Sequence, residues 1–356
     1  MDFEEFKEKL VDDVQEGLYG RGIDDVQIFT KHTEKLNSSY ETLMAQQEGV
    51  PCGVCINMNA AFSQVLKGSS YEAVLDQVLD AVVSGIEQAP VYNAEELMDY
   101  EKMKDKLCVE VVSAERNALV LSDVPHRTME DMAVVYRVQV DKNEDGRSTF
   151  LVTNHLLEVF GVTPEQLHED AMRNSPEIRP IVIAGMREVL ADTNNPEIMD
   201  YLESHESEPE VMYVATVPDR ISGAGVVAYQ NFMDEAAERL GGDFYILPSS
   251  VHELILLPDD GKMDYRELTS MVEMVNNTQV EPEERLTYNV YHYDSKEHVF
   301  ELAEKFDARV QERLAAKEEK ASVLQELKEK QKDVEKSAPV KKTVEKAVKN
   351  KGEEVL

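Results

Sequence analysis

The sequence predicts an α+β protein with two folded parts and a helical tail. Segments with apolar residues every three or four positions, typical of helices, mix irregularly with alternating segments, typical of strands. With 356 residues and a 42% apolar share, the chain can bury the core of one large domain or two. We expect a small α+β unit over residues 1–90, a main α+β unit with antiparallel strands over 107–300, and a charged helix and disordered tail over 301–356.

The first unit is predicted to fold as a helix, three strands and a helix. Phe3, Phe6, Leu10 and Val14 recur at helical spacing, so residues 2–18 predict an amphipathic helix. The glycines of "LYGRG" end it. The following segments are assigned as strands over 26–33, 38–46 and 53–58, and as a helix over 71–86.

The main unit is predicted to combine a hairpin with further strands and several helices. The expected strands cover 132–140, 147–153, 211–217, 243–248, 252–258 and 286–294. Its expected helices cover 154–161, 163–175, 180–190, 196–203, 224–240, 264–276 and a stretch from about 295 onward, and a further helix is expected before this unit, over 94–106. Residues 107–113 fit a strand or part of a longer helix. "NEDG" (143–146) is typical of a turn between the first two strands.

Two of these helices carry explicit boundary signals. Thr163 is expected as an N-cap with Pro164 at the first helical position, and Gln166 completes a capping box. The Gly-Gly pair at 241–242 is expected to end the helix over 224–240.

The net charge of −34 is distributed unevenly along the chain. Residues 301–356 hold 14 Lys and Arg against 13 Asp and Glu, which leaves 23 against 58, a net charge of −35, for residues 1–300. A body of this charge repels phosphate backbones, so we expect no direct nucleic-acid binding. It disfavours anionic membranes and favours solubility, cations or a protein partner with a basic surface.

Composition also indicates a location. The N-terminal "MDFEEFKEKL" lacks the basic and apolar regions of a signal peptide, and no apolar run reaches the ~18 residues of a membrane helix. Three cysteines do not make a disulfide framework. We expect a cytoplasmic protein that contacts no membrane, and the oligomeric state is left open.

The tail after about residue 316 is rich in Lys and Glu. It predicts a solvated helix that frays into a disordered end, with Pro339 as an interruption. A helix that joins a coiled coil is the alternative, although the apolar spacing is not sustained over enough heptads.

"PCGVC" places Cys52 and Cys55 at C-x-x-C spacing. In redox proteins that motif opens a helix, whereas here it leads into a strand. A zinc site needs a second pair of ligands, and Cys108 stands alone. We therefore expect no metal ion, and we interpret both cysteines as small, partly buried residues.

"GAGVVA" (223–228) matches G-x-G-x-x-A, with Asp243 twenty residues beyond Gly223. The context argues against a dinucleotide site, because "PDRIS" separates the strand from the first glycine. We expect Ser222 to cap a helix that starts with small packing residues, and we expect no cofactor.

"DVPHRTMED" (123–131) places His126 and Asp131 just before a strand. Asp131 could orient His126 as a general base. The alternative is a polar turn in which Arg127 pairs with nearby acids.

"YHYDSKEH" (291–298) spaces His292 and His298 six residues apart, which is not a helical metal spacing. We expect Asp294 or Ser295 to cap the helix that follows.

"LPSSVHELILLP" (247–258) is neither H-E-x-x-H nor G-x-S-x-G. Pro248 and the two serines favour a turn between strands. Alternation would place Glu253 with apolar residues on one face, and Ser250 with His252 on the other. A Ser250–His252 nucleophile pair, with Glu253 or Asp131 in support, is the catalytic hypothesis, and a turn closed by the hydroxyls is the alternative.

Three segments resemble an uncharacterised domain-of-unknown-function family of Gram-positive gut anaerobes, the Clostridia. They are residues 211–258, which include "LPSSVHE", and residues 123–138 and 152–174. Residues 2–87 match more loosely, so the resemblance covers about residues 1–300. The strand around Cys52 and Cys55 departs from the family pattern. The resemblance supports the fold and a cytoplasmic location and carries over no catalytic residue.

No complete catalytic set stands out. The leading hypothesis is a non-enzymatic, acidic cytoplasmic protein that binds a basic protein partner. The alternative is a hydrolase that uses the Ser/His pair of "LPSSVHE". A third hypothesis is cation binding by the acid-rich surface.

Overall fold

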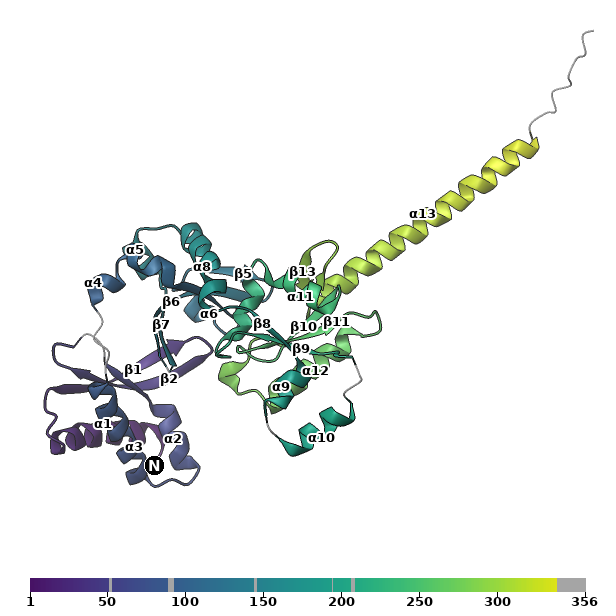
Figure 1. Ribbon diagram of the computed structural model, residues 1–356. Helices are drawn as coiled ribbons and strands as arrows, with labels where there is room; N and C mark the ends of the chain where they lie inside the picture. The colour runs from purple at the N-terminus through teal and green to yellow at the C-terminus, as the bar shows by residue number, and fades with distance from the viewer. Residues whose placement is uncertain (51–52, 89–92, 144–145, 194, 206–208, 338–356) are drawn as a thin grey trace, which may run out of the picture. The chain divides into compact units, whose positions relative to one another are not determined.

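Antiparallel sheets and helices confirm the α+β class (Figure 1). The computed structural model describes residues 1–50, 53–88, 93–143, 146–193, 195–205 and 209–337. The chain divides into two compact units, Met1–Ala303 and Glu304–Leu356. No helix of the described residues is long and apolar enough to cross a membrane.

The N-terminal part places three helices on one face of a sheet with the order β1-β2-β3. Its elements are α1 (Phe3–Gly20), β1 (Val26–Lys35), β2 (Ser38–Gln47), β3 (Val54–Asn57), α2 (Met58–Leu66) and α3 (Tyr71–Glu87). Helix α1 starts with a capping box between Asp2 and Glu5 and buries Phe6 and Leu10. The short helix α2 was not predicted. Its signal is Asn57, whose side chain accepts from the Ala60 N–H as an N-cap.

The second sheet has the order β4-β6-β5, and β7 pairs with β6. Its elements and neighbours are α4 (Ala94–Leu97), α5 (Tyr100–Met103), η1 (Lys104–Lys106), β4 (Leu107–Ser113), α6 (Ala118–Leu121), β5 (His126–Met129), β6 (Met132–Asn143), β7 (Gly146–Leu151), α7 (Asn154–Phe160) and α8 (Pro164–Ile178). Segment 107–113 is therefore a strand, and it is buried along its whole length. The helix expected over 94–106 breaks into short turns at Asp99, whose side chain caps α5.

Two further details of this part differ from expectation. Residues 126–129 form strand β5 rather than a polar turn. They pair with β6 in an antiparallel arrangement, with His126 opposite Val135. Thr163 caps α8 as predicted, but the Gln166 amide donates to Asp170 at 2.9 Å. The centre of the predicted "NEDG" turn lies outside the described residues.

The third sheet has six strands in the order β13-β12-β10-β11-β9-β8. Its elements and neighbours are β8 (Val182–Gly185), α9 (Met186–Ala191), α10 (Pro196–Ser204), β9 (Tyr213–Thr216), η2 (Gly223–Ala228), α11 (Phe232–Leu240), β10 (Phe244–Pro248), β11 (Leu254–Pro258), α12 (Tyr265–Thr278), η3 (Pro282–Glu284), β12 (Tyr291–Asp294) and β13 (Val299–Leu302). Each neighbouring pair runs antiparallel.

Pairing at the sheet edges overrides local helical patterns in two places. The helix expected over 180–190 begins only at Met186, because residues 182–185 pair with β9. The helix expected from 295 begins at Ala303 instead. Asp294 does not cap a helix. Its carboxylate accepts from the N–H groups of Lys296 and Glu297 and so closes the turn between β12 and β13.

The small residues of "GAGVVA" form a 3₁₀ turn, η2, rather than the start of a long helix. Ser222 lies at the N-cap position of η2, but its side chain makes no capping hydrogen bond and its backbone is left-handed, with φ 49°. A Cβ on Gly223 would lie 2.1 Å from Thr216 Oγ1 and 2.4 Å from the His252 carbonyl oxygen. Gly225 packs on the backbone of β4, where a Cβ would lie 3.4 Å from the Val109 oxygen. The glycines therefore serve close packing, which explains the motif without a nucleotide.

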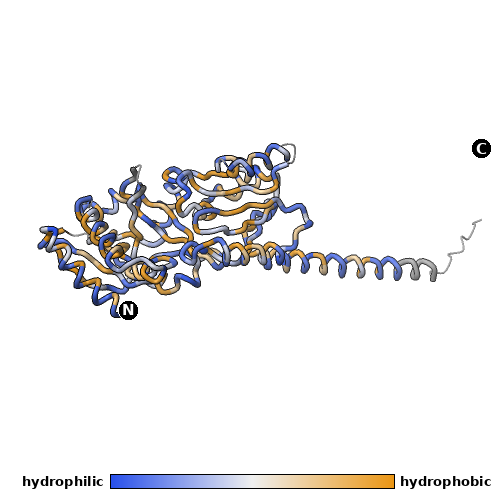
Figure 2. The backbone as a smooth tube through the Cα atoms, turned by 90° about the horizontal axis from the view of Figure 1, so that it is seen from below, coloured by the Kyte–Doolittle hydropathy of each residue, from blue (hydrophilic) through white to orange (hydrophobic). Residues whose placement is uncertain are grey.

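The second and third sheets share one apolar core, with η2 between their backbones. Figure 2 shows that apolar and hydrophilic stretches of backbone alternate along the chain. On its opposite face the six-stranded sheet packs against α12 through Leu268 and Val272. The layers are thus sheet, shared core, sheet and helix α12.

The second unit is described by helix α13, which runs over Ala303–Ser337. Its side chains from Gln311 to Lys330 are all exposed, as predicted for a solvated helix. The predicted disordered end lies outside the described residues.

Replacing Gly223 tests the close packing of η2. Gly223→Ala should lower the free energy of unfolding by about 3 kcal/mol, the upper end of overpacking costs, because the methyl group meets a backbone carbonyl. Urea denaturation measures the change. Gly20→Ala is the control, since nothing lies within 4 Å of its Cβ position and the change there should be small. Equal stabilities for the two variants would contradict the packing account.

Candidate functional site

The segment Ser249–Glu253 links three parts of the main body through its backbone. The Val251 carbonyl oxygen accepts from the Ala224 N–H at 3.1 Å. The Val251 N–H donates to the Glu284 carbonyl oxygen at 2.8 Å. The His252 oxygen accepts from the Thr216 hydroxyl at 2.8 Å. The segment is therefore a junction between β9, η2 and the region before β12.

The side chains of Ser250 and His252 take structural positions at this junction. Ser250 is almost buried, and its Oγ accepts from the His252 backbone N–H at 3.0 Å. His252 Nδ1 accepts from the Ser222 N–H at 3.0 Å, so the ring proton lies on Nε2, 3.4 Å from the Glu284 carboxylate. No hydroxyl–imidazole hydrogen bond joins the two residues, and each has a role in closing the turn.

The other three candidate residues do not join this pair. Glu253 precedes β11, and its side chain has no hydrogen bond or ion pair within the described ranges. His126 lies on β5, where its Nδ1 is 3.0 Å from the Val124 oxygen. Asp131 lies at the β5–β6 turn and accepts from Thr287, Asn289 and Tyr291. Burial and the nearby Asp131 raise the pKa of Tyr291 far above its usual range.

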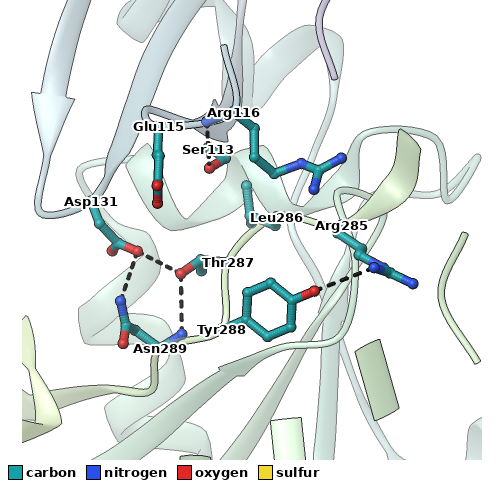
Figure 3. A pocket seen from close by; sticks show the side chains of 9 residues that line it. All are labelled: Ser113, Glu115, Arg116, Asp131, Arg285, Leu286, Thr287, Tyr288 and Asn289. Carbon is teal, nitrogen blue, oxygen red and sulfur yellow. Dashed lines mark hydrogen bonds between the residues drawn. The ribbon is translucent and has the colours of Figure 1, made fainter. Parts of the chain in front are cut away.

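Asp131 instead borders a polar pocket of about 480 Å³ (Figure 3). The pocket is formed by the end of β4, the following loop and the segment before β12. Its other lining residues are Ser113, Glu115, Arg116, Arg285, Leu286, Thr287, Tyr288 and Asn289. This volume lies in the range of roughly 300–1,000 Å³ that small-molecule sites occupy. Sequence reasoning identified only Asp131, because the rest come from loops that carry no motif.

A second, smaller cavity is apolar and borders the junction. We call it the methionine groove, and its volume is about 160 Å³. It is lined by Met186, Met212, Leu247, Pro248, Ser249, Ile255, Met271, Val272 and Val275. The groove is too small for a typical ligand but large enough to receive an inserted side chain. No sequence pattern indicated it, since its methionines come from three separate segments.

Carboxylates lie beside the methionine groove. The Glu210 carboxylate accepts from the N–H groups of Arg187 and Met212, at 3.2 and 3.4 Å, next to two of the methionines. Glu267 is exposed on α12 one turn before Met271, so the two side chains share a helix face. The methionine groove is thus lined by apolar side chains and bordered by the carboxylates of Glu210 and Glu267.

The two remaining histidines of interest are separate. His292 is fully buried on β12, and its Nε2 lies 3.0 Å from Asp259. His298 is exposed in the next turn, with Nδ1 3.0 Å from the Tyr293 hydroxyl. They do not form a metal site.

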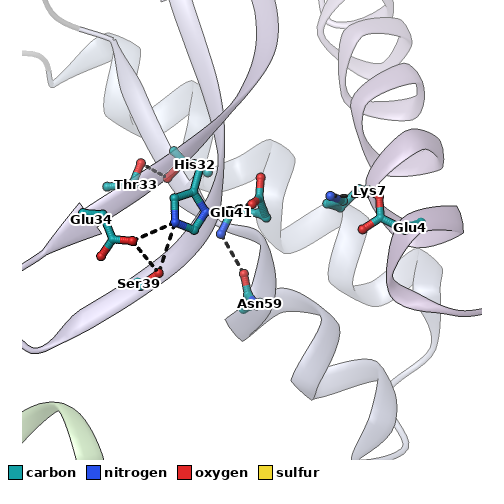
Figure 4. A network of polar contacts seen from close by, with 9 residues as sticks. Glu4, Lys7, His32, Thr33, Glu34, Ser39, Glu41 and Asn59 are labelled. Carbon is teal, nitrogen blue, oxygen red and sulfur yellow. Dashed lines mark hydrogen bonds and ion pairs between the residues drawn. The ribbon is translucent and has the colours of Figure 1, made fainter. Parts of the chain in front are cut away.

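His32 forms an exposed polar cluster that sequence reasoning missed (Figure 4). Its ring nitrogens lie 2.9 Å from Glu41 and 2.9 Å from Glu34. Hydrogen bonds to Glu41 and then Glu34 raise the pKa of His32 above its usual range. Strand pairing of His32 with Glu41 creates the contact, so only the register of β1 and β2 reveals it.

In the part of the chain that the structure describes, no group of three or more metal-ligating side chains occurs. Cys55 is exposed on β3 rather than partly buried as expected, and Cys108 is buried on β4. Cys52 lies outside the described residues.

Ser250→Ala distinguishes the turn from the catalytic hypothesis. We expect the variant to lose about 1 kcal/mol of stability, the value of one hydrogen bond, because the His252 N–H loses its acceptor. Thermal or urea unfolding measures this. Ser249→Ala should change stability little, because the Ser249 side chain makes no hydrogen bond within the described residues. Covalent labelling of the wild type by a serine-reactive probe that Ser250→Ala abolishes, without a loss of stability, would refute the turn.

Asp259→Asn tests the buried hydrogen bond between His292 and Asp259 through pH. The hydrogen bond from His292 keeps the pKa of Asp259 below its usual range, against the effect of burial. The pair therefore stabilises the fold above the unfolded pKa of about 3.9, and this stabilisation is lost as pH falls through the lower folded value. We expect the variant to be less stable than wild type near pH ~6, and the difference to shrink as pH falls below about 4.

Urea unfolding of both proteins across this pH range measures the difference. Asp76→Asn is the control, because Asp76 is exposed and has no ion pair among the described residues. A stability difference for Asp259→Asn that stays constant with pH would contradict a stabilising hydrogen bond between His292 and the ionised Asp259 carboxylate.

Comparison with known proteins gives one match. No curated protein and no solved structure matches the chain significantly. Residues 3–295 match the family of unknown function DUF5688. The match includes the junction segment, the methionine groove and the polar pocket, so all three lie in the part shared with the family. The chain therefore belongs to the family of unknown function DUF5688.

Proposed function

We propose that this chain is a non-enzymatic cytoplasmic interaction protein, which binds a basic, amphipathic segment of a partner protein. The observation that carries the proposal is an apolar groove lined by three methionines on a body with a net charge of −35 over residues 1–300. Such a body attracts a basic segment at long range. The groove then supplies the short-range apolar contact.

The methionines suit this role. Their side chains are unbranched and polarizable, so they adapt to different inserted side chains. Met271 lines the groove and is 45% exposed, so its side chain is accessible to a partner. A volume of about 160 Å³ fits one anchoring side chain of a partner helix rather than a free ligand.

The remaining candidate residues support a non-enzymatic role. Ser250 and His252 are engaged in closing the junction, and Asp131 accepts from three donors. The cytoplasmic location is supported by the free, exposed thiol of Cys55, which a reducing compartment preserves.

A matched pair of methionine variants tests the groove. Met271 lines it, whereas Met274 is equally apolar, 59% exposed and on the same helix but not in the lining. The probe is a synthetic amphipathic helix of Leu and Lys, ~18 residues long or five turns. Met271→Gln should weaken its binding about fivefold to tenfold, because ~1 kcal/mol of apolar burial is lost. Met274→Gln should leave the affinity unchanged.

Isothermal titration calorimetry at low and high salt measures these affinities. A peptide of the same composition with its leucines scattered, and a Leu/Glu helix, are the controls. Equal weakening by both substitutions, or equal affinity for the scattered peptide, would reduce the interaction to general charge attraction. Turnover of a small molecule by the purified chain would contradict the non-enzymatic proposal.

A further inference from the structure

The polar pocket holds two arginines whose positive charge is not neutralised. The Arg116 guanidinium donates to the Pro282 oxygen at 2.6 Å. Arg285 donates from Nε to the Val280 oxygen at 3.1 Å and from Nη1 to the Tyr288 hydroxyl at 3.3 Å. No carboxylate of the described residues lies within 4.0 Å of either group.

The chain has 71 acidic and 37 basic residues, so carboxylates are abundant. Several other arginines of the described body pair with them, among them Arg21 with Asp80 and Arg173 with Asp170. Each guanidinium has five N–H donors, so Arg116 and Arg285 keep donors beyond those that hold them to the backbone. Carbonyl oxygens fix their positions while leaving their charge available for an anion.

The opposite wall of the pocket is acidic. Figure 3 shows Glu115 and Asp131 on one side of the cavity and the two guanidinium groups on the other. Asp131 is already satisfied by its three donors. Glu115 is exposed, more than 4.0 Å from both guanidinium groups, and without an ion pair in the described ranges. Glu115 is therefore the group available for a cation.

We propose that this pocket binds a small zwitterion, with the carboxylate of the ligand at Arg116 and Arg285 and its ammonium at Glu115. Free amino acids and short peptides with free termini belong to this class. A polyanion such as a nucleotide would meet two carboxylates in the same cavity, and a dication would meet two arginines. The cavity of about 480 Å³ accommodates such a ligand, with Leu286 and Tyr288 as its apolar contacts.

The separation of the charged walls favours a ligand with separated charges. A dipeptide spans about 7 Å when extended, at roughly 3.3–3.6 Å per residue. Its terminal ammonium and carboxylate are thus separated, as are Glu115 and the two guanidinium groups, which lie more than 4.0 Å apart. The site is independent of the methionine groove, since the two share no lining residue.

Calorimetry on the full chain tests this site with charge-matched probes. L-alanyl-L-alanine and L-alanine carry both charges, N-acetyl-alanyl-alanine lacks the ammonium, and alanyl-alanine amide lacks the carboxylate. Inorganic phosphate is the probe for a simple anion site. We expect at least one zwitterion to bind, and both blocked forms of the dipeptide to bind at least tenfold more weakly than the dipeptide or not at all.

Variants assign the binding to the pocket. Arg116→Gln and Glu115→Gln should each weaken binding of the zwitterion at least tenfold, whereas Arg239→Gln, an exposed arginine of α11 outside the pocket, should not. Glu115→Gln removes no hydrogen bond within the described structure, so it remains informative if Arg116→Gln lowers the melting temperature. Binding of neither zwitterion, or equal binding of phosphate with no effect of Glu115→Gln, would overturn the proposal.

Discussion

The apolar core shared by the second and third sheets depends on a close backbone contact at Gly223, where there is no room for a side chain. At Gly223 the chain passes so close to the His252 carbonyl and the Thr216 hydroxyl that a Cβ would overlap both. The junction is then closed by the Ala224 N–H, which donates to the Val251 oxygen. This contact lets η2 lie against β4, and the two sheets consequently share one apolar core. Protein interiors are packed densely, so such a contact leaves little tolerance for change.

The same junction shapes the methionine groove. Residues Leu247, Pro248 and Ser249 line it just before the tied segment begins, and Ile255 lines it just after. Backbone hydrogen bonds at Val251 and His252 therefore hold one wall of the groove, while α12 supplies the other. The segment that looked most like a catalytic motif thus forms a turn and part of the wall of a cavity. Its polar side chains fix the turn, and its apolar flanks face a cavity.

The sequence predicted most elements because their signals are local. The apolar face of α1 and the Thr163 cap could be read from a few adjacent residues. Strand β8 and strand β13 could not, because they exist through pairing with β9 and β12, which local patterns do not encode. The site was harder still. Asp131 was found from its neighbours, but its donors Thr287 and Tyr291 come from more than 150 positions away.

In the proposed function, charge and apolar contact have separate roles: the acidic body would attract the partner, and the methionine groove would receive its apolar side chain. The most direct test follows the methionine methyl signals of the ¹³C-labelled chain by NMR during titration with the basic amphipathic helix. The account predicts that the signals of Met186, Met212 and Met271 shift together, with saturation at one equivalent. Shifts confined to methionines outside the groove, such as Met274, would contradict it.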